Sequence, residues 1–107
     1  MNIPKKLKIG GHVVKVVHMD DLILEDGTEL LGAASGGENT ILLARHANGR
    51  VVQESTEEET FLHEIMHIVT DNAGMRLKEH QVNAIAAGLH QVLRDNRLCF
   101  FPDKVKK

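Results

Sequence analysis

The sequence TFLHEIMHIV, residues 60–69, places two histidines four positions apart, with a glutamate directly after the first. On an α-helix, positions i and i+4 lie one above the other, about 5–6 Å apart at Cβ. His63 and His67 can therefore offer imidazole nitrogens to one metal ion, with bonds of about 2.0–2.1 Å if the ion is zinc. Glu64 is rotated by about 100° around the axis, so it can reach a water on the open side of the metal and act as a general base.

The residues around this motif predict the helix that it requires. Ser55 and Thr56 each stand three positions before a glutamate, which is the spacing of a reciprocal N-terminal capping box. Apolar residues recur through the segment at helical spacing, and Gly74 is a favourable residue to end the helix. A second helix is predicted over residues 78–96, where the apolar positions are Val82, Ile85, Ala86, Leu89, Val92 and Leu93.

The residues before Gln53 have short patterns typical of strands. Apolar and polar residues alternate on both sides of Gly10-Gly11, which predicts a hairpin. Residues 32–40 are expected to form a flexible connection, and residues 41–44 a strand that pairs with residues 51–53 across the Asn48-Gly49 turn. Strands followed by two helices predict one α+β domain over residues 1–107, with a small antiparallel or mixed sheet.

The composition narrows the class of protein. The chain has 107 residues and a net charge of −2, which argues against a nucleic-acid-binding surface. The single cysteine, Cys99, permits no internal disulfide, and no apolar run is long enough for a signal peptide or a membrane span. We therefore expect a cytoplasmic protein without a nucleic-acid or membrane partner. We also expect Phe100 and Phe101 to pack on the core.

A catalytic zinc ion normally has three protein ligands and one open position, so a third ligand is needed. The start of the second predicted helix offers Glu79 and His80, and Asp71 is a rival at the end of the first helix. Asp71 lies about 6 Å further along the axis than His67, and its side chain is short. We favour Glu79, with Asn83 one turn later as a neighbour that could orient a ligand; His80 and Asp71 stay open.

The sequence TFLHEIMHIV, together with LKEHQVNAIAAGLHQVLRDN at residues 77–96, resembles the small zinc metallopeptidases of phages and prophages. These are similar to minimal gluzincins and, more distantly, to the ImmA/IrrE metallopeptidases. The resemblance is strong over residues 60–96 and looser before them. It implies a zincin-like domain in which His63, His67 and Glu79 bind Zn²⁺ and Glu64 is the catalytic base. The similar proteins often have aspartate at the position of Asn83, so asparagine implies a weaker metal site here.

These observations predict a zinc-dependent peptidase with a peptide or protein substrate, bound along the edge of the 41–44 strand. A donor for the developing oxyanion is not identified, because the chain has no tyrosine. The residues left open for this role are His80, His90, His46 and Arg45. Two alternatives remain: a zinc-binding module without catalysis, and a module of phage or prophage origin that binds another protein through its apolar helix faces.

Overall fold

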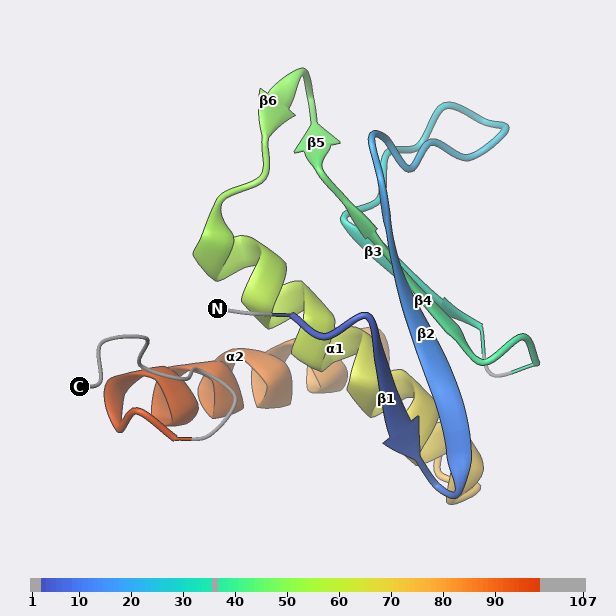
Figure 1. The fold of residues 1–107 in the computed structure, drawn as a ribbon, viewed down its shortest axis with the longest axis vertical. Coiled ribbons are helices and arrows are strands. Elements are labelled where there is room, and N and C mark those ends of the chain that lie inside the picture. Colours follow the sequence, from blue (N-terminus) through green and yellow to red (C-terminus); the bar gives the residue numbers. More distant parts are fainter. Residues whose placement is uncertain (1–2, 36, 99–107) are drawn as a thin grey trace.

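The computed structural model describes residues 3–35 and 37–98, so the expected packing of Phe100 and Phe101 lies outside the described residues. A four-stranded mixed sheet is followed by two helices, which confirms the predicted α+β class. Helix α1 (Glu54–Asn72) lies between the sheet and helix α2 (Glu79–Asp95) (Figure 1). Neither described helix is long and apolar enough to cross a membrane.

The sheet has the strand order β1-β2-β4-β3. Its strands are β1 (Lys6–Ile9), β2 (His12–Met19), β3 (Gly32–Ser35) and β4 (Thr40–Ala44). Strands β1 and β2 form the predicted antiparallel hairpin, and both residues of the Gly10-Gly11 turn have positive φ angles, +58° and +85°. Strand β4 runs parallel to β2 and antiparallel to β3, so β3 is an edge strand.

Two strand predictions were wrong. Residues 32–35 form β3 and not a flexible connection, although glycine, alanine and serine are weak strand formers. Strand β4 pairs with β2 and β3 and not with residues 51–53, because its side chains are buried and the strand occupies the interior of the sheet. The Asn48-Gly49 turn closes a smaller hairpin, of β5 (His46–Ala47) and β6 (Arg50–Val51).

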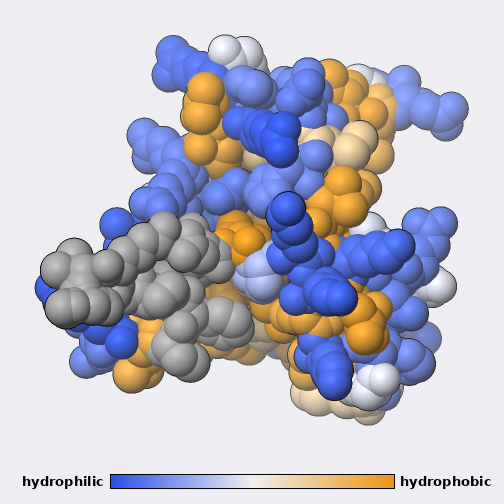
Figure 2. All heavy atoms as spheres, viewed as in Figure 1, coloured by the Kyte–Doolittle hydropathy of each residue, from blue (hydrophilic) through white to orange (hydrophobic). Residues whose placement is uncertain are grey.

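The core lies between the sheet and α1. Alternate residues of β2 point to opposite sides, so that Val14 and Val16 are buried while Val13 and Val17 are exposed. From α1, Phe61 and Ile68 pack against the inward-facing residues of the sheet. On the face seen in Figure 2, groups of apolar side chains reach the surface between hydrophilic ones. One face of the sheet therefore carries the core and fixes the position of α1.

The ends of α1 differ in how well the sequence predicted them. Gln53 is the N-cap and makes no side-chain cap, so the predicted capping by Ser55 or Thr56 was wrong. The Val52 N–H still donates to the Arg45 carbonyl (2.9 Å), so the helix begins as soon as this strand-like pairing ends. Gly74 was predicted correctly: it has a φ of +73°, and the bonds of a Schellman motif close the helix around it.

Helix α2 matches the predicted range and packs against α1. Val82 and Ala86 are its buried apolar residues. A buried side-chain hydrogen bond also joins the two helices, with His90 Nε2 lying 2.8 Å from Glu58 Oε1. Three further apolar residues of the predicted face stay exposed, namely Ile85, Leu89 and Val92. This packing brings the first residue of α2 beside the middle of α1.

Candidate metal centre

Three side chains converge at the point where α2 begins beside α1. Nε2 of His63 and Nε2 of His67 lie 3.0 Å apart, as expected for residues one turn apart on the same helix face. Glu79 completes the group: its Oε2 lies 2.8 Å from Nε2 of His63, and its Oε1 lies 3.2 Å from Nε2 of His67. Of the three residues considered for the third ligand, the described structure groups Glu79 with the histidines, and neither His80 nor Asp71.

The spacing of these atoms fits one small cation. Ligand atoms around a tetrahedral ion with bonds of about 2.0–2.1 Å are about 3.3 Å apart, close to the separations found here. Two imidazoles and a carboxylate that direct lone pairs at one point repel each other unless a proton or a cation lies between them. His63, His67 and Glu79 could therefore hold a metal ion. Imidazole and carboxylate suit several divalent metals, so the ligand set alone does not define which one.

The three candidate ligands differ in their exposure to solvent. The side chain of His63 is 12% exposed, that of His67 is 31% exposed and that of Glu79 is 65% exposed. A bound ion would have protein on the α1 side and solvent on the Glu79 side. That arrangement leaves coordination positions open to water or to a ligand, which is typical of catalytic sites and not of closed structural ones.

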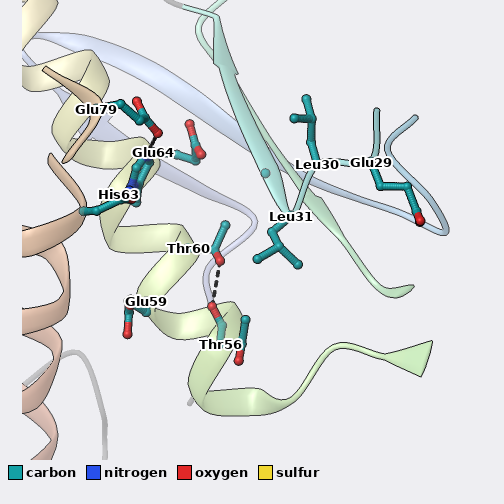
Figure 3. A pocket seen from close by; sticks show the side chains of 11 residues that line it. Glu29, Leu30, Leu31, Thr56, Glu59, Thr60, His63, Glu64 and Glu79 are labelled. Atoms are coloured by element: carbon teal, nitrogen blue, oxygen red, sulfur yellow. Dashed lines mark hydrogen bonds and ion pairs between the residues drawn. The ribbon is translucent and has the colours of Figure 1, made fainter. Parts of the chain in front are cut away.

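Glu64 lies next to this group but does not belong to it. It points from α1 towards β3 (Figure 3), is only 6% exposed and makes no hydrogen bond to the described residues. Burial, and secondarily the negative charge of Glu79, raises the pKa of the Glu64 carboxyl to about 7. A buried carboxyl group with a raised pKa beside a metal-ligand cluster has the properties of a general base or acid.

Gly32 makes the close approach of β3 to this helix possible. A Cβ atom at this position would lie 2.6 Å from Thr60 Cγ2, 3.1 Å from the Leu42 carbonyl oxygen and 3.2 Å from Glu64 Oε2. A larger residue would therefore push the edge strand away from Glu64 or displace the Glu64 carboxylate. Sequence reasoning missed Gly32, although a glycine within a strand is a signal of close backbone approach.

A cleft of about 380 Å³ opens between the start of β3 and α1 (Figure 3). Its walls are formed by Glu29, Leu30, Leu31, Gly32, Thr56, Glu59, Thr60, His63, Glu64, Glu79 and Asn83. Asn83 thus lies at the site, as predicted, but among the described residues it makes no hydrogen bond to either histidine. The cleft is therefore lined by two of the three candidate metal ligands, His63 and Glu79, by the buried Glu64 and by the start of the edge strand β3.

The strand expected to offer an exposed edge, residues 41–44, is not an edge strand. Strand β4 is interior, and β3 lies beside the cleft at the edge of the sheet. The Ala44 N–H donates to the Leu31 carbonyl (2.9 Å), and the antiparallel register alternates from there. The backbone groups of Gly32 and Ala34 therefore point away from β4, on the side where β3 has no neighbouring strand in the described sheet.

The described structure does not place any of the four residues left open as oxyanion donors in the wall of the cleft: His80, His90, His46 and Arg45. His90 is paired with Glu58, and Arg45 lies 3.7 Å from Asp20. The ring of His46 contacts the Asp20 backbone oxygen. The residues that line the cleft therefore do not include an oxyanion donor predicted from the sequence.

A scan against protein-family models, a search of curated proteins and a search of solved structures found no match to this chain.

Proposed function

We propose that this chain is a zinc-dependent metallopeptidase in which His63, His67 and Glu79 bind the metal and Glu64 is the catalytic base. The observation that carries the proposal is the position of Glu64: it is buried, directed into the cleft, and set between the metal-ligand cluster and the edge strand. The resemblance of residues 60–96 to small phage and prophage zinc metallopeptidases supports the same conclusion.

In this function, a zinc ion held by His63, His67 and Glu79 would supply the Lewis acidity that makes a water molecule easier to deprotonate. Glu64 takes a proton from the attacking water and later gives it to the leaving amine. Burial raises the pKa of this carboxyl group to about 7 in the metal-free site, and a metal ion beside it would favour the ionised form that a base requires. A second role of burial is to keep the Glu64 carboxylate free of competing hydrogen bonds until water and substrate enter.

The substrate in this proposal is an extended peptide that adds to the free edge of β3. The outward backbone groups of Gly32 and Ala34 can form main-chain hydrogen bonds to such a peptide. The close packing of Gly32 against Glu64 would bring the bound backbone near the proposed base. A strand of four short residues offers little side-chain specificity at that edge, so backbone pairing would supply the main contacts.

The decisive experiment compares zinc content and peptide hydrolysis in wild type, His63→Ala, Glu79→Ala and Glu64→Gln. We expect one zinc per chain in the wild type and in Glu64→Gln, and loss of zinc in the other two variants. Hydrolysis of a peptide library should occur only in the wild type. A wild type that binds no zinc, or a Glu64→Gln variant that retains full hydrolysis, would contradict the proposal.

A second candidate function is protein binding through α2. Ile85, Leu89 and Val92 form an exposed apolar row on this helix, and such rows often contact partners. In that case, replacing all three by polar residues would abolish partner binding without any effect on zinc content. The same replacement leaves peptide hydrolysis intact if the metallopeptidase proposal is right, so one triple variant distinguishes the two functions.

A further inference from the structure

A second hollow, of about 580 Å³, adjoins the metal-ligand cluster on the side of the C-terminal end of α1. It is lined by His67, Thr70, Asp71, Gly74, Met75, Arg76 and Leu77. His67 belongs to both features, since it is one of the three potential metal ligands and also part of this wall. A molecule bound over the metal from the first cleft would therefore reach this hollow next.

Arg76 gives the second hollow its chemical character. It is exposed and, among the described residues, has no ion pair; Asp71 lies in the same wall but not within ion-pair distance. A guanidinium group carries five N–H donors in a planar fork that matches a carboxylate. Its accessible position beside a metal ligand makes Arg76 a candidate to bind a carboxylate of a ligand.

The first cleft, in contrast to the second hollow, is lined by acidic side chains. Four glutamates line it, namely Glu29, Glu59, Glu64 and Glu79, and no lysine or arginine is among the described residues of its wall. An anionic group would be repelled there, whereas the second hollow offers a cation. The two sides of the metal-ligand cluster thus differ in charge, and this difference can fix which way a substrate lies.

We propose that the hollow lined by Arg76 is a subsite for a substrate carboxylate, on the side of the metal away from the glutamate-lined cleft. This inference rests on the proposed peptidase function and adds a substrate class: peptides with an acidic side chain, or with a free C-terminal carboxylate, near the cleaved bond. The negative charge of Asp71 repels a bound carboxylate, so removing this charge is expected to strengthen the subsite.

The test uses the zinc-loaded chain and pairs of peptides with blocked ends that differ only by glutamate or glutamine at one position near the cleaved bond. A further pair compares a free with an amidated C-terminus and separates the two sources of carboxylate. At one position we expect the carboxylate to raise kcat/KM by roughly 1.5- to 5-fold, the range of an exposed ion pair. The preference should weaken with added salt.

Three variants identify the residue responsible. The preference should disappear in Arg76→Gln, increase in Asp71→Asn, and persist in Arg50→Gln, which removes the same charge from the exposed tip of the β5–β6 hairpin. An equal preference in wild type and Arg76→Gln would overturn the inference. So would the absence of any carboxylate preference in the wild type.

A binding measurement separates this inference from the proposed activity. The zinc-loaded wild type is titrated with acetyl-Ala-Glu-Ala-amide and with its glutamine counterpart, and NMR follows the Arg76 side-chain N–H signal. Suppose that the wild type cleaves no peptide but binds the glutamate peptide more tightly than the glutamine peptide, and that Arg76→Gln abolishes this difference. That result would uphold the subsite and refute the peptidase proposal. Cleavage without carboxylate preference would do the reverse.

Discussion

Replacing Glu64 by glutamine is expected to stabilise the metal-free fold at alkaline pH, at the same time as it removes the proposed base. The carboxyl of Glu64 has a pKa of 4.5 when solvated and of about 7 in the fold. Below the lower value the group is neutral in both the folded and the unfolded chain, so it adds no pH-dependent cost. As pH rises through the interval between the two values, the unfolded chain loses its proton first, and folding becomes less favourable.

The size of this cost follows from the two pKa values. Each pKa unit corresponds to about 1.4 kcal/mol, so the full difference costs about 3 kcal/mol above neutral pH. Partial contact of the carboxylate with solvent in the cleft screens part of it, which leaves roughly 1–3 kcal/mol. Glutamine has nearly the same shape and no charge. The metal-free Glu64→Gln variant should therefore be more stable than wild type by this amount at about pH 8.5 and not at about pH 4.

Urea unfolding in the presence of a chelator, at both pH values, measures the difference. Glu59→Gln is the matched control, because it removes an exposed carboxylate from the same helix. Excess zinc should abolish the advantage of Glu64→Gln at high pH, since a dication beside the carboxylate favours its ionised form. A stability difference that is the same at both pH values, or a wild type that is the more stable at pH 8.5, would refute the reasoning.

Three further predictions test the strand edge and the metal surroundings. Gly32→Ala should lower the free energy of unfolding, measured by urea titration, by roughly 1–3 kcal/mol, because the added Cβ would lie 2.6 Å from Thr60 Cγ2. Adding Thr60→Ser removes that methyl group and should restore part of the lost stability. Ala34→Pro should reduce kcat/KM for peptide hydrolysis without releasing zinc, because the N–H that it removes points away from β4. Ala33→Pro is the control: it removes an N–H directed at β4 and should mainly destabilise the fold in thermal unfolding. Asn83→Asp should tighten zinc binding in a chelator competition, and unchanged or weaker affinity would count against a role for this position.

The parts of the site that depend on local geometry could be predicted from the sequence. The spacing of His63 and His67 on one helix face follows from the helix repeat, and their nitrogens do lie 3.0 Å apart. Glu79 was favoured as the third ligand because it opens the next helix, and the structure does bring it to the histidines. Both helices and the first hairpin were also found from periodicity and turn residues.

The parts that depend on long-range pairing could not be predicted in this way. Strand β3 consists of small residues without alternation, and it forms because β4 supplies its hydrogen-bonding partners. The parallel pairing of β2 with β4 joins segments more than twenty residues apart, and no local signal encodes it. Because the pairing of β4 was missed, β4 was taken for an edge strand, and the close approach of Gly32 to Glu64 was missed with it.

The position of Glu79 would couple metal binding to helix packing in this small fold. Glu79 is largely exposed, so its own side chain has few contacts to hold it in place. It is the first residue of α2, and its location follows from the packing of Val82 and Ala86 and from the hydrogen bond of His90 with Glu58. The histidines belong to α1, so an ion bound by all three residues would link the two helices. Metal binding should therefore stabilise the packing of α1 against α2, and a weakened helix interface should lower metal affinity by the same free energy.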